Sequence, residues 1–326
     1  MVIAVGHLPD ASEVLLALPC GMPFVQSSEF AAAFRAFGLT PAGTSIYAFN
    51  PVFRVCFQGQ EAVLKRTQAL ANAPRVGHWA RALQAAGVQV VTPLTEPREV
   101  DDRVWVIYPF IQGREYDGSR ADIRAAGRLL GQMHAVQSDV LVRFQWPDNT
   151  PESIQDDVEG LEQLRETGKL EALVAGRLIS WEQAFNTDVY APLQAADVPW
   201  VDASMDFKAN NLVYGPDGLP TLVDPDNGEF VPRILDLALA ALLFHLDLPA
   251  PGRLFTLEEW RKFLAGYSEH VTLTETERTL WPLALRYILQ EWGVWHLISD
   301  EEGWKNAVQG GFLRDLAGVN LETYML

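Results

Sequence analysis

The chain has 326 residues, of which 48% are hydrophobic and 21% charged, a composition typical of a folded globular protein and not of a disordered one. Its 25 Lys and Arg against 42 Asp and Glu give a formal net charge of −17, which disfavours nucleic acid or an anionic membrane as a partner and favours small cationic ligands. Only two cysteines are present, too few for a disulfide framework, so we expect a reduced, cytoplasmic setting.

No segment predicts a membrane anchor or a signal peptide. The apolar patch at residues 14–18 has acidic residues around it and no basic region before it. The longest apolar stretch, residues 234–246, contains Asp236 and His245 and is shorter than the ~20 residues needed to span a bilayer. We expect a buried helix there and no membrane partner.

The first part of the chain predicts a short helix and a small antiparallel sheet. Apolar residues recur at helical spacing over 29–37, with Ser27 or Ser28 as the cap and Gly38 as the end of the helix. A second helix is expected over 74–86. Runs rich in β-branched and aromatic residues predict strands at 46–49, 52–57, 61–66, 88–94 and 104–108.

Lys65 ends the third predicted strand, after three apolar residues. Its ammonium group could reach solvent or be directed into a cleft as a fixed positive charge, and the strand pattern alone leaves both open. The connector at 108–113 mixes Pro and Gly with aromatic residues. We place the boundary between two lobes there, with an N-terminal lobe of residues 1–112 and a C-terminal lobe of residues 113–326.

Beyond this connector the sequence predicts mostly helices. Apolar residues recur at helical spacing over 122–136, and we interpret His134, near the end of this helix, as a hydrogen-bonded core residue rather than a metal ligand. Further helices are expected at 154–166, 170–175, 180–195, 232–244, 256–267, 275–300 and 302–313.

A predicted hairpin interrupts these helices. Two apolar runs, 211–214 and 219–223, flank a Gly-Pro-Asp-Gly sequence that is typical of a tight turn. Pairing of the two strands would bring Asp206, Asn211 and Asp224 to the same edge. Oxygen ligands gathered in this way can hold a divalent cation and leave one carboxylate to act as a base.

These residues resemble the catalytic segment of the aminoglycoside phosphotransferase and choline kinase group, a branch of the protein-kinase-like fold. The group has H-G-D-x-x-x-x-N, then a hairpin, then I-D. Asp206 matches its catalytic aspartate, while Asn211 and Asp224 match its two metal ligands. The resemblance implies an α+β, two-lobed fold, with an antiparallel sheet in the small N-terminal lobe and a larger, mostly helical C-terminal lobe.

The resemblance also implies cofactors and a substrate class. Lys65 falls where the group has its ATP-binding lysine, Ser45 falls in the nucleotide loop, and Tyr108, Phe110 and Ile111 fall in the hinge. The implied activity is transfer of the γ-phosphate of ATP, or of another nucleoside triphosphate, with Mg²⁺. The implied acceptor is a hydroxyl of a small cationic molecule, such as an aminoglycoside or an amino alcohol.

The chain departs from this pattern at three points. The nucleotide loop at 43–45 is poor in glycine. Ser204 and Met205 replace the His-Gly that usually precedes the catalytic aspartate. The second helix carries no glutamate, so we expect Lys65 to pair with His78, with Gln84 or with the nucleotide phosphates. A kinase-like protein that binds a nucleotide or metabolite without turnover is therefore the alternative function.

Three polar residues near the hairpin have an open or structural interpretation. Lys208 is either an exposed loop lysine or a charge near the transferred phosphoryl group. Asp226 either contacts the metal through water, two residues after Asp224, or is a residue of the Asp-Asn-Gly turn, and the turn is favoured. Asp236 is expected to cap its helix and hold the catalytic loop.

The C-terminal helices offer a hypothesis for the acceptor site. Glu291, Trp292, Trp295 and His296, with the acids at 300–302 after them, combine carboxylates with indole faces, which suits a polyamine or a quaternary ammonium. The alternative is that Trp292, Trp295 and Ile298 form a core stripe of an ordinary helix. The sequence leaves the oligomeric state open.

Overall fold

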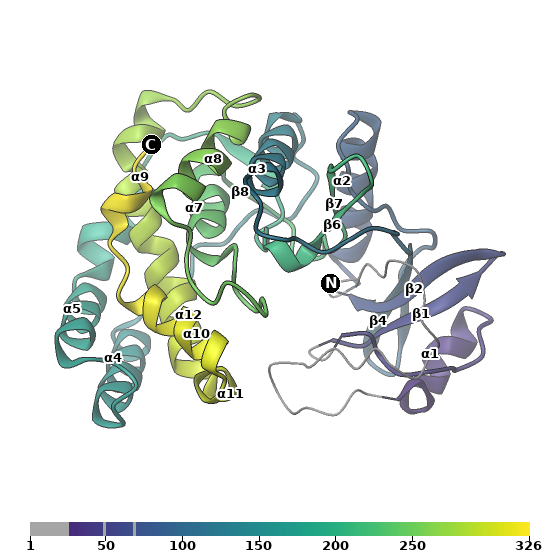
Figure 1. Ribbon diagram of the computed structural model, residues 1–326, viewed down its shortest axis with the longest axis horizontal. Helices are drawn as coiled ribbons and strands as arrows, with labels where there is room; N and C mark the ends of the chain where they lie inside the picture. Colours follow the sequence, from purple (N-terminus) through teal and green to yellow (C-terminus); the bar gives the residue numbers. More distant parts are fainter. Residues whose placement is uncertain (1–25, 48–49, 68–69) are drawn as a thin grey trace.

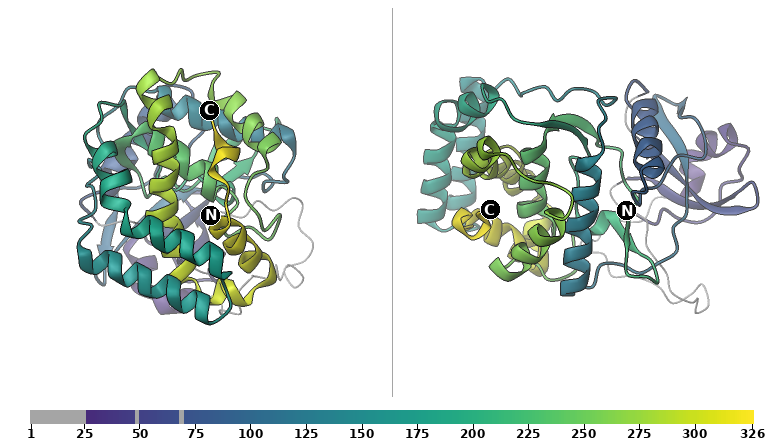
Figure 2. Two further views of the ribbon diagram at one scale, coloured as in Figure 1. Left: turned by 90° about the vertical axis from the view of Figure 1, so that its left-hand side faces the viewer. Right: turned by 90° about the horizontal axis from the view of Figure 1, so that it is seen from above.

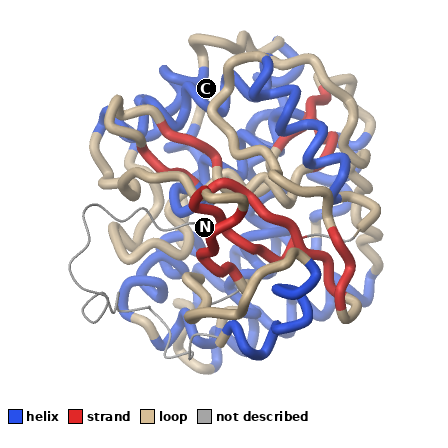
Figure 3. The backbone as a smooth tube through the Cα atoms, turned by 90° about the vertical axis from the view of Figure 1, so that its right-hand side faces the viewer, coloured by secondary structure: helices blue, strands red, loops and turns tan. Residues whose placement is uncertain are grey.

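The computed structural model describes residues 26–47, 50–67 and 70–326, and the chain forms two lobes (Figure 1). The smaller lobe holds a four-stranded antiparallel sheet of order β1-β2-β4-β3. Seen from the side of this lobe, the strands lie in front of the helices of the larger lobe (Figure 3). The elements of the smaller lobe are the 3-10 turn η1 (Ser27–Phe30), α1 (Ala31–Ala36), β1 (Val52–Phe57), β2 (Gln60–Thr67), α2 (Ala73–Ala85), β3 (Arg98–Val100) and β4 (Arg103–Pro109).

The alternation of side chains along the central strand β2 decides which of its residues reach the site. Leu64 points to the face that packs against Phe34 of α1. Its neighbours Val63 and Lys65 point to the opposite face, because successive residues of a strand alternate. On that opposite face the apolar cluster continues into the larger lobe, through Val52, Val63, Val106, Tyr108, Val213 and Val223. Lys65 is therefore directed at the boundary between the lobes.

The larger lobe is mostly helical and contains two short hairpin-like sheets, β5-β8 and β6-β7. Its first helix, α3, lies at the side of this lobe that faces the smaller one (Figures 1 and 2). The helices are α3 (Arg120–Ala135), α4 (Pro151–Glu166), α5 (Ala172–Gln183), α6 (Ala191–Gln194), α7 (Arg233–Leu243), α8 (Leu257–Tyr267), α9 (Glu275–Ile288), α10 (Val294–Ser299), α11 (Glu301–Lys305) and α12 (Ala307–Ala317). Two π-helical turns, η2 (Asn186–Tyr190) and η4 (Leu289–Gly293), and two 3-10 turns, η3 (Ala209–Asn211) and η5 (Leu321–Tyr324), complete the helical elements, and the strands are β5 (Trp200–Ala203), β6 (Leu212–Tyr214), β7 (Pro220–Leu222) and β8 (Glu229–Pro232).

The predicted hairpin is present as β6 and β7, and one segment before β3 and another after β4 pair with its two edges. On one edge, the N–H of Leu222 donates to the carbonyl of Gln89, and the N–H of Val91 donates to the carbonyl of Leu222 (both 3.0 Å). On the other edge, Arg114 and Tyr214 exchange two backbone hydrogen bonds of 2.9 Å. The hairpin is thereby fixed relative to the segments that enter and leave the small sheet.

Glycine allows α3 and α8 to pack with their backbones in contact. A Cβ atom at Gly127 would overlap the carbonyl group of Phe263, and one at Gly131 would lie 2.5 Å from the carbonyl oxygen of Tyr267. These two glycines are one helical turn apart and so lie on the same face of α3. The close approach sets the position of His134, which follows on the same helix.

The structure confirms the α+β architecture and corrects some of the expected elements. Residues 46–47 are not in a strand, and residues 48–49 lie outside the described part of the chain. The expected strand at 88–94 is reduced to an isolated bridge at Val90, because its first half bonds to the hairpin, whereas Leu94 donates to the carbonyl of Ile107 in the small sheet at 2.8 Å. The first helix is preceded by Gln26, which forms a capping box with Glu29, in place of the expected serine cap. The boundary near residue 112 stays a prediction.

Two helices expected at 170–175 and 180–195 also differ from the structure. A single helix, α5, bridges the gap between the two expected helices and ends at Gln183, and a π-helical turn and the short α6 follow it. The short apolar runs in this part of the sequence do not distinguish one interrupted helix from two separate helices. Among the described helices, none combines the length and the apolar character that crossing a membrane requires.

The close packing of α3 on α8 predicts opposite effects for two Gly→Ala substitutions. Gly127→Ala should lower the free energy of unfolding by about 1–3 kcal/mol, because the methyl group forces the two backbones apart. Gly176→Ala is the matched control, since this glycine lies within α5 and a Cβ there would meet nothing within 4 Å. It should raise the free energy of unfolding by up to about 1 kcal/mol through helix propensity alone. Urea denaturation measures both; equal effects of the two substitutions would contradict this account.

Candidate active site

The hairpin brings the three residues predicted from the sequence to one edge. Asp206 follows β5, Asn211 ends η3 and Asp224 follows β7. The amide nitrogen of Asn211 donates to the backbone oxygen of Asp206 at 2.8 Å and to its carboxylate at 3.0 Å. A third contact comes from Asn227, whose amide nitrogen donates to the same carboxylate at 3.3 Å. The loop between β5 and β6 is therefore closed on itself around Asp206.

Lys65 lies in the site and not in solvent. Its side chain is 4% exposed, and its ammonium forms ion pairs with the carboxylates of Asp224 and Asp226, the second at 2.9 Å. Burial works to lower the pKa of Lys65, but the two carboxylates outweigh it and hold that pKa above its usual value. Burial likewise works to raise the pKa of Asp224, and Lys65 overcomes it and holds that pKa well below its usual range. Lys65 and Asp224 are therefore both charged.

Asp226 is the residue that the sequence interpretation missed. A turn is present, since the N–H of Gly228 donates to the carbonyl of Pro225 at 3.2 Å, but the carboxylate of Asp226 is buried and serves the site. Besides the ion pair with Lys65, it accepts a hydrogen bond from the hydroxyl of Tyr108 at 2.9 Å. The turn composition concealed this role. The sequence did contain a signal for this role. The second helix has no glutamate to pair with Lys65, and an aspartate lies two residues after Asp224.

The expected partners of Lys65 on α2 are wrong. His78 and Gln84 are both exposed on that helix. The face of α2 that is buried consists of small and apolar residues instead, namely Ala73, Val76, Gly77, Trp79, Ala80 and Leu83. A buried ammonium needs a partner of opposite charge, and the turn after β7 supplies it.

Lys208 lies beside Asp206 in the site and is not an exposed loop lysine. The two charges are 3.1 Å apart, and Lys208 also lies 3.5 Å from the carboxylate of Asp247. Burial raises the pKa of the Asp206 carboxyl, while Lys208 acts in the opposite direction. Burial would lower the pKa of Lys208, but Asp206 and Asp247 hold it above its usual value, so this lysine is protonated.

A buried hydrogen-bonded chain braces the backbone just before Asp206. The carboxylate of Asp236 accepts from the N–H of Met205 at 2.9 Å and is 2.9 Å from Nε2 of His134. Nδ1 of His134 is 3.0 Å from the hydroxyl of Tyr267 on α8. Asp236 thus holds the loop that precedes Asp206, as expected, but it does not cap its helix, because α7 begins after Pro232 without a side-chain cap. His134 is a hydrogen-bonded core residue, as the sequence predicts.

The two residues that depart from the family pattern occupy distinct environments. Ser204 is fully buried, and its hydroxyl accepts from the N–H of Asp206 at 3.5 Å. Met205 has a φ of 50°, in the left-handed region where a glycine is unstrained and a side chain is not. The hydrogen bond from its N–H to Asp236 is made by this strained backbone.

The residues assigned to nucleotide binding line the boundary between the lobes in different ways. The hydroxyl of Ser45 donates to the carbonyl of Tyr47 at 2.6 Å and accepts from the N–H of Val52 at 3.0 Å, so it closes its own loop. The guanidinium of Arg54 lies over the ring of Phe110, and the central carbon of the guanidinium is 4.3 Å from the centroid of that ring. Ile111 and Phe110 both pack against the apolar cluster that contains Tyr108. The nucleotide role of these residues stays a prediction.

The C-terminal helices come close to Lys208 through His296 of α10. Burial lowers the pKa of His296 to about 4, and the charges that act on it include those of Asp247 and Lys208. Trp295 is 58% exposed, and its ring lies 4.7 Å from that of His296. The core-stripe interpretation is therefore wrong for Trp295, whereas Trp292 and Ile298 are half-buried against the main core.

The donor set at the hairpin edge fits Mg²⁺. No cluster of three or more His, Cys, Asp or Glu side chains that could by itself hold a metal occurs within the described ranges 26–47, 50–67 and 70–326. Asn211 and Asp224 instead provide one amide and one charged carboxylate, which are hard oxygen donors. Mg²⁺ is commonly bound by one or two such protein ligands together with substrate phosphates and water.

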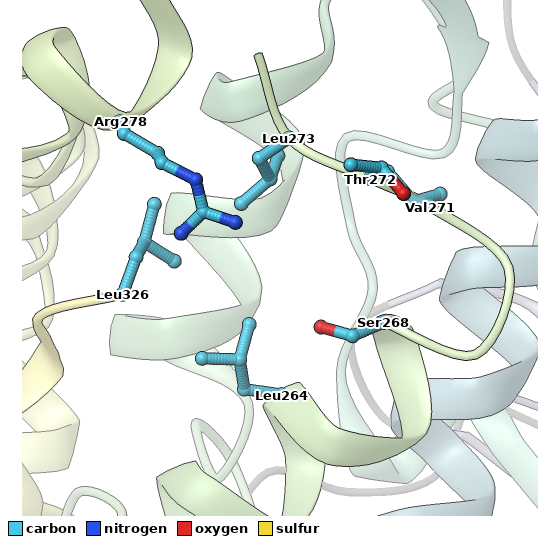
Figure 4. Close-up of a pocket in the computed structure, with 7 residues that line it drawn as sticks. All are labelled: Leu264, Ser268, Val271, Thr272, Leu273, Arg278 and Leu326. Atoms are coloured by element: carbon cyan, nitrogen blue, oxygen red, sulfur yellow. The ribbon is translucent and has the colours of Figure 1, made fainter. Parts of the chain in front are cut away.

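Two further cavities lie outside this group of residues. One, of about 140 Å³, is formed by α8, the segment that follows it and the C-terminal residue Leu326 (Figure 4). The other, of about 460 Å³, is lined by residues 143–146 and 194–197 and by Trp200. None of the residues predicted to bind nucleotide or metal lines either cavity.

Solved structures with the same fold support this reading of the architecture. A structure of the amicoumacin kinase hAmiN with AMP-PNP, Ca²⁺ and Ami is 17% identical, with a TM-score of 0.56, and the match covers 82% of this chain and 86% of that one. A spectinomycin phosphotransferase with ADP and spectinomycin is 13% identical, with a TM-score of 0.56, over 92% and 99% of the two chains. A microcompartment-associated aminopropanol kinase is 18% identical, with a TM-score of 0.53, over 86% and 93%.

Sequence comparison assigns the family. No curated protein sequence matches this chain significantly. The family model described as the phosphotransferase enzyme family matches residues 48–281, which is more than half of the chain and includes the hairpin, Lys65 and Asp236. The chain therefore belongs to the phosphotransferase enzyme family.

Proposed function

We propose that this protein is an ATP- and Mg²⁺-dependent kinase that phosphorylates a hydroxyl of a small cationic molecule, of the aminoglycoside or amino alcohol type. The observation that carries the proposal is the convergence of Lys65, Asp206, Asn211 and Asp224 at one edge of the hairpin. Membership of the phosphotransferase enzyme family supports it. ATP as the donor agrees with the cytoplasmic setting expected from the cysteine content.

The roles follow from what phosphoryl transfer requires. The transition state is loose, with negative charge on the equatorial oxygens, so a protein contributes mainly position and positive charge. Lys65, which is protonated and buried, would hold the nucleotide phosphates. Asn211 and Asp224 would hold Mg²⁺, which supplies positive charge to the phosphate oxygens. The apolar cluster around Val63 and Tyr108 would pack against the base.

Asp206 would orient the acceptor hydroxyl and accept its proton. Its carboxylate is fixed on one side by Asn211 and Asn227 and on the other by Lys208, so its direction is set before the acceptor arrives. Burial raises its pKa, which makes it a better proton acceptor than an exposed aspartate. Lys208, held between Asp206 and Asp247, places a positive charge beside the reacting groups.

The acceptor side supports a cationic substrate. The excess of acidic residues over the whole chain attracts small cations. Beside His296, the exposed indole of Trp295 provides a face for an ammonium group. His296 beside it is neutral at pH 7, because burial lowers its pKa to about 4, so it does not repel such a group.

A nucleotide- or metabolite-binding protein without turnover is the second candidate. The strained backbone of Met205, at the position where the family has glycine, favours it. A screen of hydroxylated amines and sugars for stimulated ATP consumption decides between the two. Stimulation by at least one acceptor is expected, and a screen with tight ATP binding but no turnover would favour the binding protein.

Substitution of Asp206 should separate chemistry from binding. Asp206→Asn keeps the size of the side chain and removes the proton acceptor, so turnover should fall by about 100-fold or more while ATP affinity changes little. Asp217→Asn is the matched control, since it removes one carboxylate from the exposed turn of the same hairpin. Steady-state kinetics with a responsive acceptor measures both. Substantial turnover in Asp206→Asn would show that Asp206 is not the key group.

The metal site predicts how nucleotide binding depends on Mg²⁺. ATP should bind the native protein much more tightly with Mg²⁺ than with a chelator, because Asn211 and Asp224 require the cation to meet the phosphates. In Asp224→Ala this dependence should largely disappear. Isothermal titration calorimetry with and without Mg²⁺ provides the measurement. Binding that is indifferent to both the cation and the substitution would contradict the kinase proposal.

A further inference from the structure

Asp226 and Tyr108 lie beside the nucleotide lysine, outside the catalytic and metal roles described above. We propose that Asp226, oriented by Tyr108, is the positioning residue that holds Lys65 toward the nucleotide phosphates, in place of the helix glutamate that this chain lacks. This inference rests on the proposed function. It assigns a role on the nucleotide side of the site to a residue of the turn that follows β7.

The need for such a residue follows from burial. The side chain of Lys65 is 4% exposed, and a charge so far from water requires a partner. In kinases the partner is a glutamate on a helix of the small lobe. Here α2 (Ala73–Ala85) contains no acidic residue, so the partner must come from elsewhere.

Asp224 cannot fill this role alone if it also binds the cation. Its carboxylate contacts Lys65 in the structure, but in the proposed function it is shared with Mg²⁺ and Asn211. Binding of a divalent cation weakens the hold of this carboxylate on a nearby ammonium, because both positive charges compete for it. Asp226 is a second carboxylate at 2.9 Å from Nζ of Lys65, and it can keep the ammonium in place when Asp224 turns to the metal.

The geometry of Asp226 fits an anchor better than a metal ligand. Oδ2 faces the ammonium of Lys65, and Oδ1 accepts the hydroxyl hydrogen of Tyr108 at 2.9 Å. Both oxygens are therefore engaged, and both partners are buried. The turn that carries Asp226 is itself closed by the hydrogen bond from Gly228 to Pro225.

The sheet register places the two partners of Asp226 side by side. Lys65 of β2 is paired with Val106 of β4, and Val63 is paired with Tyr108, so Lys65 and Tyr108 are diagonal neighbours on the same face of the sheet. One carboxylate thus joins two strands of the small lobe to the turn after the hairpin. The lysine is positioned by these rigid elements and does not depend on the movement of a helix.

The test compares nucleotide binding in four variants, without any acceptor. Asp226→Asn should weaken the binding of ATP in saturating Mg²⁺ by about tenfold or more, the effect of losing a charged hydrogen-bonded partner. Adenosine, which has no phosphates, should bind unchanged, and the Mg²⁺ concentration at half-maximal ATP binding should not move. Tyr108→Phe should act in the same direction by a few-fold. In Lys65→Met, the further change Asp226→Asn should add nothing, because Asp226 acts through the lysine.

Two matched controls separate this role from general loss of structure. Asp217→Asn removes a carboxylate from the same hairpin, and Tyr324→Phe removes a buried tyrosine hydroxyl that donates to the carbonyl of Phe255, in the larger lobe. Neither should change the ratio of ATP to adenosine affinity. Thermal melting checks that each variant is folded. Should Asp226→Asn not fold, Tyr108→Phe carries the test, and an unchanged ratio in it overturns the proposal.

The outcomes distinguish this inference from the proposed function. Native ATP affinity in Asp226→Asn would overturn the anchor role and leave the kinase proposal intact. A shifted Mg²⁺ midpoint, with the full loss of affinity still seen in the Lys65→Met background, would make Asp226 a metal ligand and also overturn the anchor. Absence of ATP binding by the native protein would overturn the proposed function itself, and this inference with it.

Discussion

The buried ammonium of Lys65 is the constraint on which the site depends. Taking an ammonium and its partner carboxylates out of water costs several kcal/mol per ion, and only close pairing offsets that cost. Lys65 comes from the middle of the small sheet, whereas Asp224 and Asp226 follow the hairpin of the larger lobe. Because neither side can leave its charge buried alone, this contact ties the two lobes at the point where the proposed function places the nucleotide. Removing one partner therefore lowers the free energy of unfolding by more than the intact pair contributes to it, because the other charge stays buried alone.

The second constraint is the backbone before Asp206. Met205 adopts a left-handed conformation, which costs a non-glycine residue of order 1 kcal/mol or more. The chain maintains it with a fully buried relay, from Tyr267 through His134 to Asp236 and the N–H of Met205. The glycine contacts of α3 with α8 fix the distance between His134 and Tyr267. A histidine from another helix thus supports the loop in which Ser204 stands at the usual position of the family histidine.

Part of this arrangement could be predicted from the sequence, and the reasons for success and failure are physical. The hairpin was predictable because its turn residues and apolar runs are local signals, and the hairpin alone brings Asp206, Asn211 and Asp224 together. The strand expected at 88–94 is absent because Gln89 and Val91 bond to the hairpin of the other lobe while Leu94 bonds to the small sheet, a division that no local pattern reveals. Asp226 was misjudged because turn chemistry and burial are compatible, and only the tertiary structure shows that its carboxylate faces Lys65.

The distribution of charge around Asp206 and Asp224 supports the divalent cation of the proposed function. Lys65 lies between Asp224 and Asp226, and Lys208 lies between Asp206 and Asp247. Among these described residues, two lysines face four carboxylates, which leaves an excess of negative charge in a site that is partly shielded from water. Neutral His296 does not reduce this excess, because burial lowers its pKa to about 4. Burial of uncompensated charge is costly, so a doubly charged cation stabilises the group as a whole. The same excess would repel the polyphosphate of ATP unless the nucleotide brought such a cation with it.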